Sequence, residues 1–579
     1  MDFFSRGKAV IVFLTGFLSL AFFVPPQALA LASNNIPLDS PVYHYLDKLA
    51  SFGLITSDFK GIRPITRAEA ARLLFEAEKN RAEDKERAGG DEDQYYYTTN
   101  WDSPGTGSMA GGGVLAGEMI HELRHYLERE ITLRDEPEST PFLDASPLSS
   151  FRIRYVNVDG VPRSYERPVY DAGGDGVFGI GSGLRTRTPF PAGVTQQHGS
   201  EGTPLLENNE GVIYKHGSNA ELRFESEAFA GRYLSALVEP MILYSKSDGL
   251  LQGRLNKGYA KLGGGWLELE VGRDANWLGL GERGNITLTN NAANLDIAKL
   301  SSPEPIDAWI FGKLKYAVIF SRLDSSETGG VARRPYFLAM KISLKPAPNV
   351  ELGLNIGKEL GGPGVNNSLS SYAKGIFGGT SSDNTNTLGG LEVRLRLPFL
   401  RNTELYGEFS GEDSAKVWPT AESYVAGIFI PRLTSDGRND FRFEYFIGHQ
   451  QLYTNGTFPQ GYIYHGMPLG HSQGGAAEDF FARYRHWFTA RNYLALDYIH
   501  TERGNLGRVP VNSSGQLDLT GVMQAVERTN AGRISWNIPI NKQIDATFMY
   551  GWERVNNLNL VGGVQQTNQV VTTDISYRF

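Results

Sequence analysis

The chain has 579 residues, a formal net charge of −8 and no cysteine. Acidic and basic residues are mixed, so the charge gives no case for nucleic-acid binding. The lack of cysteine excludes disulfides, thiolate catalysis and zinc or iron–sulfur sites with cysteine ligands. Gly reaches 67 residues and mean hydropathy is slightly polar. A helical membrane protein does not have this composition, whereas a barrel does, because only every second strand residue meets lipid.

The first thirty residues have the order of a secretory signal. Arg6 and Lys8 form a short basic region, an apolar run follows over 9–24, and Ala28 and Ala30 form a small-residue cleavage site. The apolar run is short for a retained membrane helix, so cleavage is favoured. After residue 30 no apolar stretch of helix-spanning length follows. We therefore predict an exported chain without a helical membrane span.

Helix signals gather in the segment after the predicted signal. Ser40 is a hydroxyl N-cap that precedes a proline, and Gly53 is placed to end the helix that they begin. Thr66 and Glu69 match a capping box, which predicts the start of a second helix. Apolar residues at helical spacing predict a third helix over 114–131. Together these signals predict a small helical unit.

From about residue 151 onward, apolar residues recur at every second position. A period of two indicates a strand with one apolar face. In one such segment, Leu222 and Phe224 alternate with Glu221 and Arg223. The pattern is found in 219–228, 390–397, 439–447, 544–553 and 569–579.

The last of these segments ends on an aromatic residue, Phe579, and Val571, Ile575 and Tyr577 lie on its apolar face. It resembles the closing strand of bacterial outer-membrane β-barrels, which commonly ends in phenylalanine. Soluble sandwiches also alternate. However, the alternation recurs to the end of the chain without a helical pattern, charges repeat on one face of single strands, and aromatic residues gather at strand ends. These three features favour a transmembrane barrel.

We predict an all-β, antiparallel transmembrane barrel of about 16–18 strands with a small N-terminal α-helical periplasmic domain. The predicted division is a signal peptide at 1–30, the helical domain at 31–135 and the outer-membrane barrel at 136–579. Gly-, Ser- and Asn-rich stretches predict outer loops at 360–389, 454–478 and 503–518. Residues 160–211 are predicted to fold across the lumen. Mixed charge signs within single strands favour internal ion pairs and a filled, narrow lumen.

Three blocks of the chain carry a resemblance to a known family. The first lies in the helical unit, over 36–38, 49–55 and 64–73; the second covers 271–281 and 287–296; the third covers 464–471 and is followed by Asp479. Together they resemble the capsule assembly Wzi family of outer-membrane proteins. In the second block Leu278 follows Trp277, where the family pattern has Trp-Gly-Pro-Gly.

The resemblance implies a monomeric barrel of about 18 strands with a periplasmic helical bundle. It also implies a protein that attaches or organises capsular or extracellular polysaccharide at the cell surface, without catalysis and without a cofactor. The implied partners are the polysaccharide and outer-membrane lipid. Peptidoglycan and periplasmic export components are further candidates.

Polysaccharide binding needs aromatic faces for sugar rings and charged groups for hydroxyls and acidic sugars, and Arg and Trp are common in recognition sites. The second and third blocks contain residues of these kinds. The candidate binding residues are Arg273, Trp277, Arg283, Tyr464, His465 and His471. The alternative is that Arg273 is a lumen charge and Trp277 an aromatic residue of the membrane interface. No catalytic or metal-binding residue is predicted.

Two other classes of function stay open. Thr66-Arg67-Ala68-Glu69 is similar to part of a surface-layer homology module, which would indicate a porin with a peptidoglycan-binding module. Residues 470–474 match the G-x-S-x-G nucleophile elbow around Ser472, but a loop precedes the serine where the elbow needs a strand. A lipase or deacylase at the barrel rim would need a histidine base, for which the candidates are His465, His471, His486 and His500.

Overall fold

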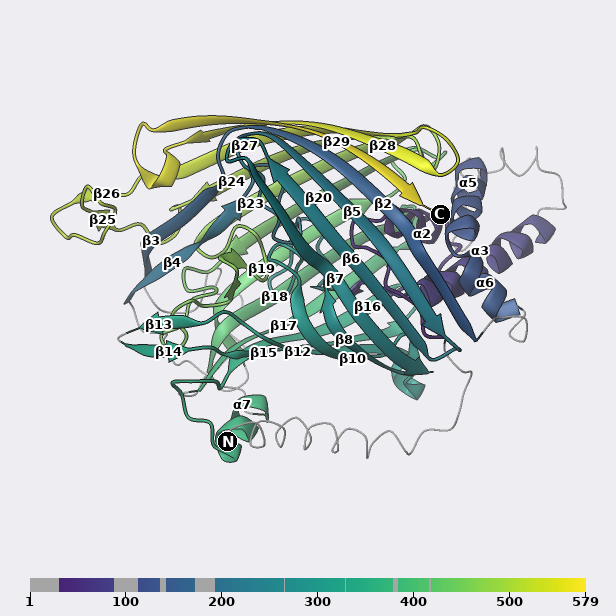
Figure 1. The fold of residues 1–579 in the computed structure, drawn as a ribbon, viewed down its shortest axis with the longest axis horizontal. Coiled ribbons are helices and arrows are strands. Elements are labelled where there is room, and N and C mark those ends of the chain that lie inside the picture. The colour runs from purple at the N-terminus through teal and green to yellow at the C-terminus, as the bar shows by residue number, and fades with distance from the viewer. Residues whose placement is uncertain are drawn as a thin grey trace.

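The structure is a computed structural model in which residues 31–87, 113–135, 142–171, 193–264, 266–328, 330–377, 384–415 and 418–578 are described. The predicted signal peptide at 1–30 and the terminal Phe579 lie outside the described residues. The described chain forms a large barrel with helices at one end (Figure 1).

The wall of the barrel is a closed antiparallel sheet. Its strands are β2 (Leu143–Asp159), β5 (Gly217–Ala230), β6 (Leu234–Ser245), β7 (Leu250–Gly264), β8 (Leu267–Asp274), β10 (Leu295–Ser301), β11 (Ile306–Asp307), β12 (Lys313–Arg322), β15 (Tyr336–Ala347), β16 (Val350–Leu360), β17 (Thr385–Leu397), β18 (Thr403–Ala415), β19 (Trp418–Ile430), β20 (Asn439–Gly448), β23 (Ala477–Trp487), β24 (Tyr493–Arg503), β27 (Glu527–Pro539), β28 (Ile544–Asn556) and β29 (Gln565–Arg578).

The short pieces β10 and β11 both pair with β12, so the described wall counts eighteen strands. The ring closes where β2 pairs with both β29 and β5, and Phe151 lies opposite Tyr577 on one side and Phe224 on the other. The prediction of an antiparallel barrel with a strand number in this range is confirmed.

Outside the wall, small elements form hairpins, turns and helices. The helices are α2 (Val42–Ser51), α3 (Arg67–Arg87), α5 (Gly113–Tyr126), α6 (Glu128–Asp135) and α7 (Leu369–Phe377), with 3-10 turns η1 (Trp309–Phe311), η2 (Pro398–Leu400) and η3 (Leu558–Leu560). The paired short strands are β1 (Ile62–Arg63) with β9 (Trp277–Leu278), β3 (Arg163–Asp171) with β4 (Gly193–Gly202), β13 (Ser326–Thr328) with β14 (Val331–Arg333), β21 (Ile463–Tyr464) with β22 (Met467–Pro468), and β25 (Pro510–Val511) with β26 (Val522–Met523).

The alternation of the strands separates an outer apolar face from an inner polar face. Leu222 and Trp552 are exposed on the outside of the wall, whereas their neighbours Glu221 and Glu553 are buried inside it. Each predicted apolar face therefore points outward, where lipid would cover it. A sheet that spans a membrane needs two things: apolar side chains on the face that meets lipid, and a closed ring of strands whose backbone groups are all hydrogen-bonded. This barrel wall has both.

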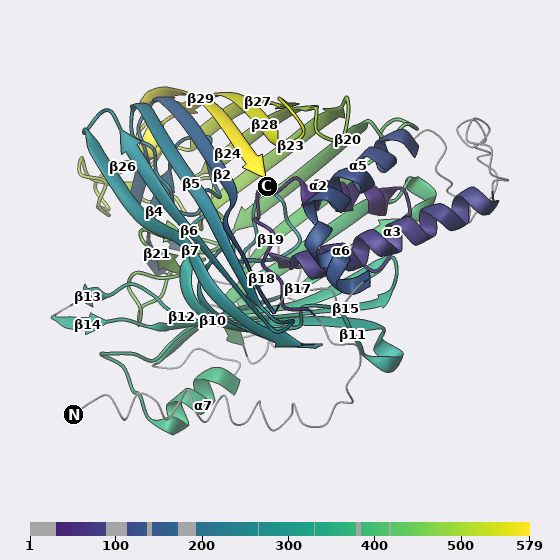
Figure 2. The same ribbon diagram turned by 45° about the vertical axis from the view of Figure 1, so that its right-hand side comes forward.

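The helices α2, α3, α5 and α6 gather beside the last strand at one end of the barrel, which we call the helix end (Figures 1 and 2). The hairpins β3–β4, β13–β14 and β25–β26 project from the opposite end, which we call the loop end. No helix in the described part of the chain is long and apolar enough to cross a membrane.

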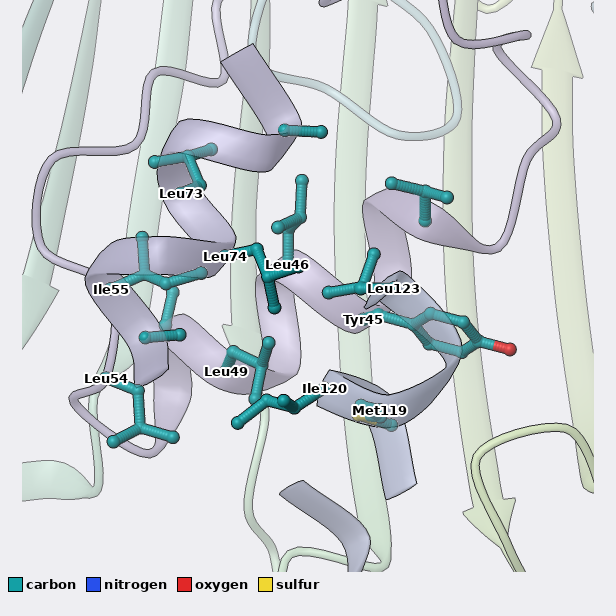
Figure 3. Packing of buried hydrophobic residues seen from close by; sticks show 14 of the residues in the cluster. Tyr45, Leu46, Leu49, Leu54, Ile55, Leu73, Leu74, Met119, Ile120 and Leu123 are labelled. Carbon is teal, nitrogen blue, oxygen red and sulfur yellow. The ribbon is translucent and has the colours of Figure 1, made fainter. Parts of the chain in front are cut away.

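Apolar side chains from three helices meet in one core (Figure 3). Leu49 of α2, Leu74 of α3 and Leu123 of α5 are almost fully buried in it. One half of the predicted capping box is present: the Glu69 backbone N–H donates to Thr66 Oγ1 at 3.1 Å, while the Glu69 carboxylate accepts from Arg72. The predicted third helix is two helices, α5 and α6, which meet at residue 127.

Candidate functional site

Charged residues of the helix end and the wall join inside the lumen. Asp58, which follows α2, accepts from Arg394 and Arg396 at 2.8 Å each and from Lys345 at 3.0 Å. Burial alone would raise the pKa of Asp58, but the three cations hold that pKa well below its usual range. The mixed lumen charges therefore pair with each other and with the inserted segment, as the sequence predicted.

Three segments from the loop end also enter the lumen. Glu210, in the stretch predicted to fold across the lumen, pairs with Arg223 and Lys257 of the wall. The β3–β4 hairpin of the same stretch stays at the loop end (Figure 1). The predicted outer loop at 454–478 turns inward, because Tyr462 is fully buried and packs edge-on against Phe337. The segment between β9 and β10 lies inside as well.

Arg283 belongs to this inner segment and is buried. Its Nε donates to Asp479 Oδ2 at 3.0 Å, and its guanidinium also pairs with Glu207. Its backbone N–H donates to Glu444 Oε2 at 2.7 Å. Every one of these partners comes from a different part of the chain, so Arg283 ties the inner segments to the wall. Its donors are already used inside the protein.

His471 is also buried, and its ring stacks on Phe446 with centroids 3.7 Å apart. Its backbone N–H donates to Tyr453 Oη, and its Nδ1 accepts from the Gln473 backbone N–H. Burial lowers the pKa of His471 to about 3, so the imidazole is neutral at physiological pH. The side chain is part of the packed interior.

The nucleophile-elbow pattern around Ser472 does not have the arrangement of a catalytic triad. Ser472 Oγ is buried without a hydrogen-bond partner among the described residues. Asp497 pairs with Arg483 and Arg533, and His500 shares a hydrogen bond with Asn530. No helix follows the serine; the next regular element is β23. The elbow needs a base on the nucleophile and a strand-turn-helix context, so this site offers neither.

Trp277 lies inside the barrel, because β9 pairs with β1 and places Trp277 opposite Arg63. Its side chain is buried. The alternative of a membrane-interface aromatic at this position is therefore wrong. The pairing instead joins the inner segment after β8 to the segment that leads from α2 to α3.

Arg273 faces outward on β8, not into the lumen. Glu268 and Glu270 of the same strand are buried inside, and Val271 is exposed on the outer face that Arg273 shares. Arg273 donates from Nε and Nη2 to the two carboxylate oxygens of Asp296 at 2.7 and 2.9 Å. The alternative of a lumen charge is wrong at this position as well. A bidentate pair of this kind is geometrically well defined.

Tyr464 and His465 lie at the loop end, on the β21–β22 hairpin. His465 and Gly466 both have positive φ, at 49° and 79°, which suits a two-residue hairpin turn. The His465 backbone N–H donates to Asp324 Oδ2 at 2.5 Å, and the Tyr464 and His465 ring centroids are 4.2 Å apart. The His465 side chain is 60% exposed, so it presents a free edge to the outside.

Electrostatic interactions connect the hairpin with Arg273. Burial raises the pKa of Tyr464, and the carboxylates of Asp296 and Asp324 raise it further, while Arg273 and Arg334 oppose them. These groups therefore act on one another at one side of the loop end. We call Arg273, Asp296, Asp324, Arg334, Tyr464 and His465 the rim cluster.

The rim cluster contains three of the six candidate residues. The other three, Trp277, Arg283 and His471, lie in the lumen. They are buried, and so is Tyr464 of the rim cluster. Asp324 and Arg334 were missed because they flank a short hairpin with no motif around it. Asp296 falls inside the second sequence block, and its place opposite Arg273 in the strand pairing was the signal that could have found it.

Known proteins of similar sequence and fold indicate the family of this chain. The model of the family "Capsule assembly protein Wzi" matches residues 185–570. That is more than half of the chain.

The chain belongs to the capsule assembly protein Wzi family.

Among solved structures, this Wzi family member is similar to Wzi of Escherichia coli, an outer-membrane protein involved in group 1 capsule assembly and described as a carbohydrate-binding β-barrel. The two are 14% identical, the match covers 96% of this chain and 100% of that chain, and the TM-score is 0.59. OccK5 (OpdH) of Pseudomonas aeruginosa is 11% identical over 76% of this chain and 100% of that one, with a TM-score of 0.40. No curated protein matches the chain by sequence.

This Wzi family member is thus an outer-membrane β-barrel. Its helix end is the periplasmic end, and its loop end, with the rim cluster, faces the cell exterior.

Proposed function

We propose that this protein holds capsular or extracellular polysaccharide at the outer surface of the cell, without catalysis and without a cofactor. Family membership in capsule assembly supports the role, and the E. coli relative of the same fold is described as carbohydrate-binding. The observation that carries the proposal is the rim cluster, in which Asp296, Arg334 and His465 are exposed, beside a lumen crossed by ion pairs. A polymer that cannot enter the barrel can still be gripped at its outer mouth.

The chemistry of the rim cluster suits a sugar polymer. The carboxylates of Asp296 and Asp324 can accept hydrogen bonds from sugar hydroxyls, and the guanidinium of Arg334 can donate to ring oxygens or to acidic sugars. The exposed ring of His465, which lies against the buried Tyr464, supplies a flat face for stacking. Mixed charge allows the cluster to bind hydroxyl-rich and acidic units together.

Binding of purified polysaccharide to the purified full-length protein tests the proposal. We expect the Arg273→Ala/His465→Ala variant to bind about tenfold more weakly, because the few residues that dominate a binding site cost about 2 kcal/mol or more when truncated and Arg is enriched among them. Arg528→Ala is the matched control, since Arg528 forms a similar exposed pair with Glu502 on β24 and β27. The control should bind like the wild type.

The same variants can be tested in cells. A deletion strain should lose cell-associated polymer and still release free polymer, and the double variant should reproduce the loss in part. A deletion strain that keeps its capsule layer would contradict the proposed function and leave the barrel unaffected.

The remaining partners are also part of the proposal. We propose a monomer surrounded by outer-membrane lipid. The charged, exposed surface of α3, α5 and α6 faces the periplasm, where peptidoglycan or export components could contact it.

A further inference from the structure

A helix of the outer loop between β16 and β17 lies on the outside of the barrel wall. In both ribbon views α7 is separate from the strands and lies outside them (Figures 1 and 2). Glu351 and Asn355 of β16 make their contacts inside the lumen. Successive side chains of a strand point to opposite faces, and Lys358 lies an odd number of positions from both residues, so its side chain points outward. Lys358 Nζ donates to the carbonyl of Gly375 in α7 at 2.7 Å. The helix therefore packs on the lipid-facing side of the wall.

The height of this contact places α7 near the membrane. Lys358 lies two residues before the end of β16, which is roughly 7 Å inward from the loop end at about 3.3 Å per residue. Leu352 and Leu354 follow on the same outward face and are exposed on the wall. The strand surface directly below α7 is therefore the apolar band that lipid covers.

The exposed side of α7 carries apolar as well as polar side chains. A side-chain carbon added at Gly375 would lie 2.5 Å from Thr385 Oγ1, so the small residue is on the side that packs against the protein. Leu369 and Ala373, four residues apart on one face, are exposed, and Leu369 is 74% exposed. A helix in water turns its apolar face to the protein. In α7 the half-buried Ile376 does so, but Leu369 and Ala373 point away from the protein beside the exposed Ser370 and Lys374.

We infer that α7 is an interfacial helix whose exposed face lies in the outer leaflet of the membrane. Leu369 and Ala373 contact acyl chains, and the exposed Lys374 extends toward the head groups. The occupant of this face is the lipid surface, because the face is continuous with the lipid-covered wall beneath it. The helix also shields Lys358 from lipid by accepting its hydrogen bond. The loop between β16 and β17 is thereby held against the membrane.

Site-directed spin labelling of the full-length protein in phosphatidylcholine vesicles tests this inference. The chain has no cysteine, so Leu369→Cys gives a single labelling site. Leu354→Cys on the outer wall reports lipid, and Leu519→Cys, which is 85% exposed near the tip of the β25–β26 hairpin, reports water. Heat-modifiable gel mobility shows that each variant is folded before measurement.

We expect the label at position 369 to collide readily with oxygen and poorly with a water-soluble nickel chelate. Its oxygen-to-nickel ratio should shift from the value at position 519 toward the value at position 354. A ratio equal to that at position 519 would place the helix in water and overturn the inference. A label shielded from both reagents would indicate a second protein copy on this face, which would overturn it as well.

Discussion

Arg273 and Arg283 come from neighbouring segments of the chain and end in opposite surroundings. Arg273 forms an outward, partly exposed pair with Asp296, whereas Arg283 is buried with Asp479 and Glu207. The same side chain therefore serves two purposes. At the rim it fixes the largely exposed carboxylate of Asp296, and in the lumen it holds separate segments together.

We predict that Arg283→Ala lowers the free energy of unfolding by about 3–5 kcal/mol, because it leaves the buried Asp479 without its paired cation, whereas Glu207 keeps Arg533. Arg273→Ala should change that free energy by no more than about 1 kcal/mol, as expected for an exposed pair. Urea unfolding of both variants in the same lipid measures the difference. Equal losses would contradict the distinction between rim and lumen.

The buried His471 predicts a pH dependence of stability. Burial lowers its pKa to about 3 in the folded protein, and an unfolded histidine titrates near its ordinary value of 6.5. Between these values the unfolded state binds a proton that the folded state does not. Stability should therefore fall as the pH falls from about 6.5 to about 3.

The His471→Phe variant removes this titration and keeps a ring to stack on Phe446. We take the stability of the variant minus that of the wild type at pH 8 as the reference. We expect this difference to grow in favour of the variant as the pH falls through the window. Thermal unfolding midpoints between pH 8 and pH 4 measure it. A difference that does not change with pH would rule out His471 as the source.

At the scale of elements, α2 is fastened to the wall through one lysine. Lys48 forms an ion pair with Asp440 at 2.9 Å and donates to the carbonyls of Pro431 and Gly437 at 2.5 and 2.8 Å. All of these partners lie at the periplasmic end of β19 and β20. The helices therefore form a core of their own and are also attached to the barrel wall at its periplasmic end.

We predict that Lys48→Met speeds hydrogen exchange in α2 and destabilises its contact with the wall by about 3 kcal/mol, since a buried carboxylate loses its partner. Lys79→Met is the control, because the Lys79–Glu83 pair of α3 is exposed. Hydrogen exchange followed by mass spectrometry compares the two. Unchanged exchange in α2 after Lys48→Met would show that the apolar core alone holds the helix.

At the scale of the whole molecule, segments enter the barrel from both ends. Asp58 reaches wall arginines from the periplasmic end, and Arg283 and Tyr462 fill the lumen from the exterior. The ion pairs inside the lumen oppose the porin alternative. It also means that a polymer meets this protein at its surface.

We predict that the full-length protein in planar bilayers shows no large, stable open pore, because internal ion pairs occupy the lumen. Single-channel recordings at several salt concentrations check this. Long-lived openings of porin size would contradict the closed lumen and revive the porin alternative.

The sequence by itself determined the wall and the helix starts. Alternation such as that of Glu221 and Leu222 decides which face of a strand meets lipid, because each residue's side follows from the strand's period of two. The cap made by Thr66 and Glu69 is equally local, since its partners are three residues apart. These features depend on neighbours in the chain, so they could be predicted from the order of residues.

Only the tertiary structure decided where the long loops go. Arg283 meets Asp479 across 196 positions of sequence, and no local pattern reports such a contact. The inward turn of the segments that contain Trp277 and His471 follows from packing and charge pairing inside the lumen. The same loops leave Tyr464 and His465 beside Arg273 at the mouth. The location of the binding residues therefore rests on contacts between distant parts of the chain, whereas the barrel itself rests on local periodicity.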